Sequence, residues 1–347
     1  MKHAAALLCL ATLPFSACGD GGGLTTIIPE PTFDAALIVN SIDNSLTVLP
    51  LDEDEGQAFT VGLGPSGSPV TLAARGELVA VPLGGTPALA VVDLAERALA
   101  RTVALPENSG ATGVAFLSDS TVVVAHSNLN SVSVVNVLRG TVGAPIAVGR
   151  FPQRVLAAND TVWVVNAELV NFQPAGPGTV SVLTGNPLAV VRTIQLSSIN
   201  PGGAALSASA LYVVGAGNYN GNDGSLSTVH RGTGEETRHD EGFGDFPGAV
   251  AVLPDGLLAV SSFSYGLAVW NPATRTFVHA PTDPVRPGGA TAIAGLGVAP
   301  DGGLWALEAG CGQPDRAIIL DSGSMAVLRT VTVGTCPFGV VFAEVPE

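Results

Sequence analysis

Short β-branched runs recur along the chain at a nearly constant spacing, and this repeat limits the possible folds more than any other feature of the sequence. Successive runs end 41 to 49 residues apart. The seven runs are residues 37–40, 79–82, 122–125, 163–166, 212–215, 258–261 and 305–308. Because a fixed period of about 20 to 50 residues is typical of repeat architectures, the spacing predicts seven copies of one structural unit.

The copies share one internal order of elements. After each run a polar loop leads to an alternating strand, such as residues 131–135, and then to a further strand, such as residues 192–196. A Gly/Pro corner follows, as at residues 148–152, and a strand of small apolar residues ends at a turn such as residues 254–256. Alternation bounded by Gly, Pro, Asn and Asp indicates strands and hairpins. Four strands in about 40 to 45 residues make one blade of a β-propeller.

Three of these elements resemble a known repeat. A strand ending in Val-Asn (residues 163–166), a Ser-Val-Ser-Val strand (131–135) and a Val-Gly-x-x-Pro corner (148–152) resemble the YVTN-type repeats of seven-bladed β-propellers, relatives of lactonase-like and quinoprotein-like propellers. The resemblance extends over residues 34–345, with extra residues in blades four to six. It implies the fold and leaves the activity open.

The two ends of the repeat array are predicted to share one blade. The array begins at the second strand of a blade, at residues 37–40, and ends with residues 339–343, which match the first strand of that blade. Pairing of these segments removes exposed strand edges. We therefore expect an all-β fold over residues 34–347. It is a seven-bladed β-propeller of four-stranded antiparallel blades, closed by N- and C-terminal strands in one blade.

The start of the chain has the order of a secretion signal, with a positive beginning, an apolar stretch and two small residues. Residues 15–18 resemble a lipobox, which implies cleavage before Cys18 and lipid on that cysteine, although Phe15 replaces the usual aliphatic residue. The alternative is an ordinary signal peptide with an incidental cysteine. We expect a signal peptide at residues 1–17 and then lipidated Cys18 within a flexible tether, residues 18–33, rich in Gly, Pro and Thr. The protein is then exported and anchored to the cell envelope, on the periplasmic or outer-membrane face.

The acidic composition restricts the kinds of partner. The formal net charge is −15, and Lys2 is the only lysine. A negative surface repels phosphate backbones, which argues against nucleic-acid binding. A mature chain without lysine cannot form a lysine Schiff base. No apolar run after the signal reaches the roughly 20 residues that a membrane helix needs. We expect a monomer that meets the membrane only through its lipid anchor.

Two cysteines remain in the body of the chain. In a four-stranded blade, the loop between strands two and three lies on the same face as the loop after strand four. Cys311 lies in a loop of the first kind and Cys336 in a loop of the second kind. We predict a disulfide between them that closes the last blade and stabilises it by about 2 to 4 kcal/mol. The alternative is two free buried thiols.

The predicted innermost strands contain few chemically reactive groups. They are residues 70–73, 113–116, 153–156, 203–206, 248–251, 295–298 and 339–342. Apart from Thr71, Gln153 and Arg154, their residues are apolar or small. No converging set of carboxylates or histidines is visible, which argues against a metal-assisted hydrolase. We expect no metal and no cofactor.

Six polar residues are predicted at or beside the channel mouth and are candidate ligand-binding residues. They are Asn40, His126, Arg154, Asn166, Glu168 and Glu308. Their carboxylate and amide oxygens suit a hard cation such as calcium. The alternative is that Arg154 pairs with Glu168 and that the others are solvated rim residues. Residues 218–224 have nearly the spacing of a calcium loop, but Val229 occupies the place of the bidentate glutamate, so an Asn/Gly turn explains them better.

These features predict a non-catalytic module of the cell envelope that binds a protein, peptide or glycan, or that acts as a scaffold. No catalytic residue is assigned. One alternative is a lactonase- or lyase-like enzyme acting on a small molecule at the channel mouth, and another is a passive spacer. Because active sites need convergent polar groups, the composition of the inner strands favours binding.

Overall fold

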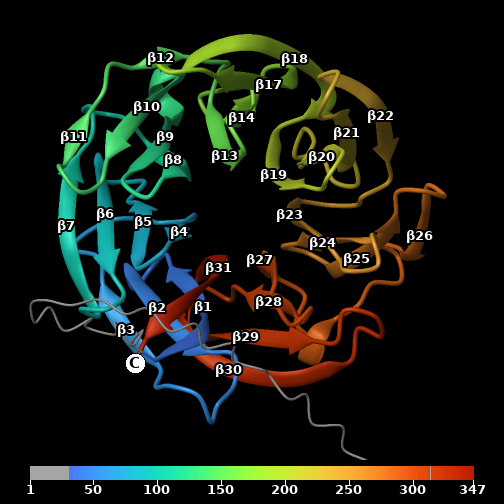
Figure 1. Cartoon of the computed structure of the whole chain (residues 1–347). Coiled ribbons are helices and arrows are strands. Elements are labelled where there is room, and N and C mark those ends of the chain that lie inside the picture. Colours follow the sequence, from blue (N-terminus) through green and yellow to red (C-terminus); the bar gives the residue numbers. More distant parts are fainter. Residues whose placement is uncertain (1–30, 313) are drawn as a thin grey trace, which may run out of the picture. The chain divides into compact units, whose positions relative to one another are not determined.

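The computed structural model describes residues 31–312 and 314–347, which form a closed ring of seven β-sheets (Figure 1). The helices in this part of the chain are two short 3-10 turns, η1 (Ser127–Leu129) and η2 (Pro287–Gly289). No helix of the described residues is long and apolar enough to cross a membrane. The predicted signal peptide, Cys18 and the tether as far as residue 30 lie outside the described residues.

Each sheet is one antiparallel blade whose strands follow one another from the central channel outward (Figure 1). Blade 1 consists of β31 (Pro337–Pro346), β1 (Thr32–Asn40), β2 (Ser45–Pro50) and β3 (Phe59–Gly62). Blade 2 consists of β4 (Ala73–Arg75), β5 (Leu78–Pro82), β6 (Ala88–Asp93) and β7 (Ala98–Ala104). Blade 3 consists of β8 (Ala111–Ser118), β9 (Thr121–His126), β10 (Ser131–Asn136) and β11 (Thr141–Val142), and β12 (Ile146–Ala147) also pairs with β10.

The remaining four blades follow in chain order. Blade 4 consists of β13 (Pro152–Ala158), β14 (Thr161–Asn166), β17 (Pro177–Thr184) and β18 (Ala189–Ile199), and a separate hairpin of β15 (Leu169–Val170) and β16 (Gln173–Pro174) extends its loop. Blade 5 consists of β19 (Pro201–Leu206), β20 (Ala210–Gly215), β21 (Ser225–His230) and β22 (Glu235–Glu241). Blade 6 consists of β23 (Pro247–Val252), β24 (Leu258–Ser262), β25 (Gly266–Asn271) and β26 (Thr276–His279). Blade 7 consists of β27 (Ile293–Val298), β28 (Leu304–Glu308), β29 (Pro314–Leu320) and β30 (Val327–Thr335).

The predicted fold class is confirmed, including the blade count and the seven β-branched runs, each of which lies in the second strand of its blade. One inner strand differs from the prediction, because residues 70–72 precede β4 instead of belonging to it. In the register of β4 with β5, Ala73 pairs with Ala80, so a longer ladder places Thr71 opposite Pro82. Proline has no N–H to donate, and the ladder ends before it.

The ring closes as predicted, through pairing of the two ends of the described chain. β1 pairs with β31 in a register that runs from Thr32 opposite Pro346 to Val39 opposite Gly339. A bulge then brings Asn40 opposite Pro337. Beyond the strands, the N–H of Glu347 donates to the carbonyl of Pro31 at 3.0 Å. The inner edge of β1 is therefore paired.

The hydrophobic core is divided among the seven blade-to-blade interfaces. Each interface holds its own cluster of buried side chains, contributed by the two facing sheets. Between blades 4 and 5, for example, Trp163 and Val180 pack with Leu211 and Val229. Each fully buried aliphatic side chain stabilises the fold by roughly 1.5 to 3 kcal/mol. The inner and middle strands are covered on both faces, which explains their nearly continuous apolar sequence.

The Val-Asn strand end and the Val-Gly-x-x-Pro corner belong to one structural device. In blade 4, the Asn166 Nδ2 donates to Thr179 Oγ1 at 3.0 Å and to Ser181 Oγ at 3.1 Å. The corner glycine Gly149 lies against this amide, since a Cβ on it would stand 2.6 Å from Asn166 Nδ2. We call this arrangement of asparagine, two hydroxyls and glycine the amide clip.

Blade 1 contains a second amide clip. The Asn40 Nδ2 donates to Ser45 Oγ at 3.0 Å and to Thr47 Oγ1 at 2.9 Å. Here the corner glycine is Gly334, whose Cβ would stand 2.7 Å from Asn40 Nδ2. The residue types of the repeat motif are therefore explained by hydrogen bonding inside the blade and by packing of the corner glycine, which precedes the blade's inner strand, against the asparagine.

Candidate ligand-binding site

The seven inner strands surround a central channel that contains two adjoining cavities. The channel cavity, of about 180 Å³, is lined by residues of all seven blades. The mouth cavity, of about 340 Å³, lies at the end where the inner strands begin. Thr71, Arg154 and Phe338 line both cavities, so these side chains stand where the two meet.

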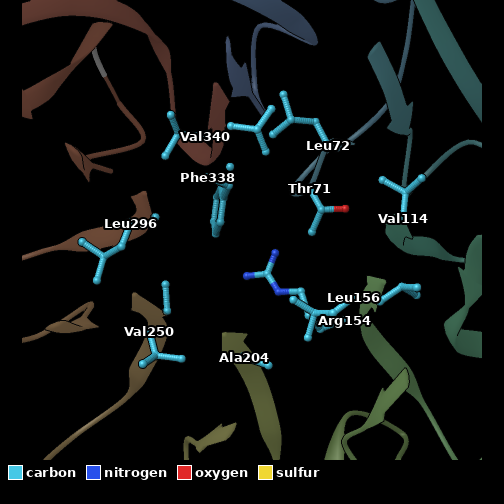
Figure 2. Close-up of a pocket in the computed structure, with 15 residues that line it drawn as sticks. Thr71, Leu72, Val114, Arg154, Leu156, Ala204, Val250, Leu296, Phe338 and Val340 are labelled. Atoms are coloured by element: carbon cyan, nitrogen blue, oxygen red, sulfur yellow. The ribbon is translucent and has the colours of Figure 1, made fainter. Parts of the chain in front are cut away.

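Apolar side chains form the wall of the channel cavity, and one guanidinium group projects among them. Each blade contributes at least one aliphatic side chain, and these include Leu72, Val114, Leu156, Ala204, Val250, Leu296 and Val340. Figure 2 shows the guanidinium of Arg154 reaching from β13 toward the centre of this ring. The inner strands are thus as apolar as the sequence predicts, with Arg154 as the charged exception.

Arg154 is held in place by the start of β13. The register of β13 with β14 shifts between Pro152 and Arg154, so Gln153 is the extra residue of a bulge and Arg154 lies opposite Val165. Its Nε is buried and makes no hydrogen bond with the protein. Burial lowers the pKa of Arg154 from its usual value, yet arginine stays protonated in proteins. The channel therefore contains a fixed positive charge.

Aromatic side chains gather at the mouth cavity in two pairs. The rings of Tyr219 and Phe246 stack at 5.9 Å between centroids with an interplanar angle of 28°. The rings of Phe263 and Phe338 are tilted by 44°, also at 5.9 Å. All four residues line the mouth cavity. We call Tyr219 with Phe246 and Phe263 with Phe338 the two aromatic pairs.

Corner residues that precede a proline contribute to this end of the molecule. Asn200, Phe246 and Cys336 each lie directly before the proline that begins an inner strand, and each has a positive φ, of 51°, 47° and 61°. Non-glycine residues with positive φ are uncommon and strained. Asn200 and Phe246 line the mouth cavity, and Cys336 forms the disulfide. The Gly/Pro corners therefore bring the side chains of Asn200 and Phe246 to the mouth cavity.

Of the six candidate residues, Arg154 alone lines either of the two cavities, as far as the described residues show. Asn40 and Asn166 are fully buried within blades 1 and 4, where they form the amide clips. His126 is also fully buried, and neither ring nitrogen makes a hydrogen bond with the protein. Burial lowers the pKa of His126 to about 4. These three residues lie inside blades and not on a solvated rim.

The two candidate glutamates form ion pairs with other residues. Glu168 pairs with Arg150 at 3.0 Å, so the alternative in which Arg154 pairs with Glu168 is wrong. The Glu168 N–H also donates to the Arg150 carbonyl, which holds these two loops together, whereas Arg154 lies further along β13 and faces the channel. Glu308 accepts two hydrogen bonds from Arg316, from Nε and, at 2.9 Å, from Nη2. The carboxylates are therefore occupied.

The predicted disulfide between Cys311 and Cys336 is present, with Cα atoms 4.4 Å apart. The buried carboxylate of Asp315 accepts hydrogen bonds from the N–H groups of both cysteines and of Gly310. Cys336 packs in a small cluster with Phe338. The disulfide and Asp315 thus fix the corner that places one aromatic ring at the mouth. A disulfide is compatible with an exported protein.

The Asn/Gly loop of blade 5, residues 218–224, is a turn. Its Asp223 carboxylate accepts the N–H of Asn218 at 2.7 Å, which is the local bonding expected of such loops. Nowhere in residues 31–312 and 314–347 do three or more His, Cys, Asp or Glu side chains gather in a way that could hold a metal ion. The loop contributes Tyr219 to the mouth cavity.

Sequence reasoning identified Arg154 and missed the aromatic pairs. A weak signal was present, since Phe246 and Phe338 flank the prolines of two corners and Phe263 directly follows a β-branched strand. The missing information was the positive φ of Phe246 and Tyr219. With such a backbone, the direction of a side chain does not follow from strand alternation.

Comparison with known proteins supports the fold. No family model and no curated protein matches this chain, so the YVTN-type assignment stays a prediction. Among solved structures, hydrazine synthase of Kuenenia stuttgartiensis is similar, with a TM-score of 0.66 and 15% identity over 80% of this chain and 90% of that chain. In all, 1062 solved chains match. A fold shared this widely does not distinguish between functions.

Proposed function

We propose that the protein is a non-catalytic, lipid-anchored module of the cell envelope that binds its ligand at the mouth of the propeller channel. The observation that carries this proposal is the mouth cavity itself. It has a volume of about 340 Å³ and joins two aromatic pairs to one unpaired cationic side chain.

The composition of the mouth cavity supports ligand binding. Binding pockets are concave, have volumes of roughly 300 to 1,000 Å³, and combine apolar walls with a few polar groups that orient the ligand. Here the aromatic rings supply the apolar walls, and Gln153, Asn200 and Arg154 supply the polar groups. About half of the lining residues lie at the ends of paired strands, and the others lie in the adjoining loops, so a rigid frame supports the loops that carry recognition.

The chemistry of the lining favours binding over catalysis. Among the described residues that line the two cavities, Arg154 and Tyr219 are the titratable ones. General acid–base catalysis most often uses a histidine or a carboxylate, and the described lining residues of the two cavities include neither, while arginine keeps its proton. The Thr71 and Thr112 hydroxyls donate to backbone carbonyls and have no adjacent base to activate them.

The path of β1 places the start of the described chain away from the mouth cavity. β1 runs from Thr32 to Asn40, and Asn40 lies at the end where the inner strands begin, opposite Pro337. Thr32 is therefore at the far end of the blade from the mouth cavity.

The binding proposal is tested by filling the mouth. Gly202 lines the mouth cavity, and a Cβ there meets only the flexible Gln153 Oε1, at 3.1 Å. Gly202→Phe therefore blocks the cavity, and Gly323→Phe on the exposed turn after β29 is the matched control. Thermal shifts are measured with a panel of sugars, short peptides and small aromatic compounds.

We expect at least one compound class to raise the Tm of the wild type and of Gly323→Phe, and to leave Gly202→Phe unchanged. A panel without effect on the wild type, or equal shifts in all three proteins, overturns the proposal. Turnover of a bound compound by the wild type would favour the alternative of an enzyme.

Lipid anchoring has a separate test. The chain is expressed with its own first 17 residues in a bacterial host that is fed a labelled fatty acid. We expect label on the wild type in the membrane fraction, and an unlabelled, soluble product from Cys18→Ser. Equal labelling of the two proteins, or none on either, contradicts the anchor.

A further inference from the structure

Arg154 is the arginine that borders the two cavities, and it has no counter-charge among the described residues. Five arginines form ion pairs with carboxylates, namely Arg75, Arg150, Arg275, Arg316 and Arg329. Arg154 forms no such pair within the described residues, and no Asp or Glu lines either of the two cavities that it borders. In a chain with 29 acidic residues and a net charge of −15, this part of the surface contains a positive charge and no negative one.

The Arg154 side chain is half-buried, and its Nε is fully buried. A guanidinium that has lost part of its water and gained no charge in return is unfavourable. Neutralisation cannot relieve this penalty, since arginine keeps its proton. The buried Nε makes no hydrogen bond with the protein, so at least this donor is free. A guanidinium donates two parallel hydrogen bonds to a carboxylate in fixed geometry. The side chain is therefore suited to receive an anion.

The surroundings of Arg154 define the rest of the ligand. The aromatic pairs line the mouth cavity above the guanidinium, and Tyr219 and Phe263 are 40% and 41% exposed, so their rings are accessible. On the side of Arg154 away from the mouth lies the channel cavity, which has a smaller volume of about 180 Å³ and aliphatic walls. A ligand that enters from the mouth thus meets aromatic rings along its body and the positive charge at its inner end.

The charge distribution limits the ligand to a single negative charge. One guanidinium can balance one carboxylate, and both cavities contain no second cationic side chain among their described lining residues. The net charge of −15 repels any further negative charge on the ligand. A polyphosphate or a polyacid is therefore disfavoured.

We propose that the mouth cavity binds a monocarboxylate with an aromatic or apolar body, whose carboxylate pairs with Arg154 and whose body packs between the two aromatic pairs. This inference rests on the proposed binding function and names its ligand class. The same chemistry occurs in a free small acid and at the C-terminus of a peptide that ends in an apolar residue, and the experiment separates these sources.

Isothermal titration calorimetry of the propeller with matched probes tests the inference. The first pair is 3-phenylpropionate and its neutral amide, and the second pair is the peptide Ala-Ala-Phe as the free acid and as the C-terminal amide. We expect the acid of at least one pair to bind at least tenfold more tightly than its amide, because a hydrogen-bonded charge pair contributes that much or more. The pair with the tighter acid identifies the source.

Variants connect the preference to the named residues. Arg154→Met keeps the apolar stem of the side chain and removes its charge, and we expect it to bind the acid and the amide equally. Phe263→Ala is expected to weaken the binding of acid and amide by the same factor. Because Arg154→Met removes an unpaired, half-buried charge, its unfolding midpoint in urea stays at or above that of the wild type, which separates loss of binding from loss of folding.

Each outcome has one meaning. If acid and amide bind equally to the wild type while Gly202→Phe abolishes both, the mouth binds ligands but the assignment of a carboxylate to Arg154 is overturned. If Arg154→Met retains the preference for the acid, the assignment is also overturned. If no probe binds to the wild type, the inference fails, and the wider panel with Gly202→Phe then decides whether the binding function fails with it.

Discussion

Blades 3 and 4 place different side chains at the same position of the repeat, and only one of them satisfies its neighbours. In blade 4, Asn166 lies opposite Thr179 and donates to this residue and to Ser181. In blade 3, His126 lies opposite Ser131, with Ser133 two residues further on. Neither imidazole nitrogen and neither serine hydroxyl has a partner in the protein.

This repeat position is therefore structural and needs an amide of the right length. The Asn166 amide is short enough to donate to both hydroxyls, and Gly149 leaves space for it. Blade 3 has no Val-Gly-x-x-Pro corner before β8. It therefore lacks the corner glycine of the amide clip as well as the asparagine, whose position His126 occupies. Buried polar groups without partners are unfavourable. Blade 3 is therefore expected to be the weaker of the two.

The largest effect is expected from removing the amide clip of blade 4. Asn166→Ala deletes two hydrogen bonds, leaves the Ser181 hydroxyl with the Gly149 N–H alone, and opens a cavity at a fully buried position, which together should lower the free energy of unfolding by about 4 kcal/mol. Urea unfolding at pH 7.5 measures the loss. The matched control is Asn128→Ala, at an exposed asparagine, which should change stability by less than about 0.5 kcal/mol. Equal losses in the two variants contradict the clip.

Blade 7 differs from blades 3 and 4 because a disulfide joins the loop after its second strand to the corner after its fourth strand. Replacing both Cys311 and Cys336 by serine removes a cross-link between residues 25 apart in the chain. The loop-closure model predicts a loss of about 3 kcal/mol. Urea unfolding of the double variant is compared with that of the wild type, with and without reductant. A wild type that unfolds identically in reductant and without it shows that the bond does not stabilise the blade.

The pH dependence of stability tests the environment of His126. Its pKa in the folded state is about 4, below the ordinary value of 6.5, so between these values the unfolded chain binds a proton that the folded chain does not. Stability is then complete above pH 6.5 and falls as the pH approaches 4. From pH 7.5 to 4.5 we expect a loss of about 2.5 kcal/mol from this group. Urea titrations of wild type and His126→Asn isolate it, and parallel curves for the two proteins refute the assignment.

The smallest effect is expected from converting blade 3 toward blade 4. His126→Asn gives Ser131 and Ser133 an amide donor in the same register, and should raise the free energy of unfolding at pH 7.5 by about 1 kcal/mol. Thermal and urea unfolding measure the gain. In a background of Ser131→Ala and Ser133→Ala, the gain should disappear. A gain that persists without the hydroxyls shows that they are not the cause.

The fold was predictable from the sequence because hydrophobic runs, alternating strands and Gly/Pro corners repeat together. Closure was predictable because residues 339–343 match an inner strand that the first blade lacks. The candidate site was predictable only in part. Arg154 lies on the innermost strand of its blade, and this place brings it to the channel. Assigning the strand therefore sufficed for this residue.

Other residues were misplaced for identifiable physical reasons. Both faces of a second strand are covered by neighbouring blades, so the polar ends Asn40 and Asn166 are buried instead of facing solvent. Glu168 has a positive φ, of 57°, and lies in a loop whose course brings it to Arg150. Tyr219 and Phe246 depend in the same way on loop dihedrals that the sequence does not reveal.

The pairing of β1 with β31 has a consequence for the order in which the protein is made. β1 is synthesised first among the strands and its partner last, so the inner edge of β1 stays unpaired until almost the whole chain is available. Contacts between segments so distant in sequence form slowly, and a free strand edge meanwhile invites pairing with other chains. A nascent or truncated chain that lacks residues 337–346 is therefore exposed to aggregation at this one edge.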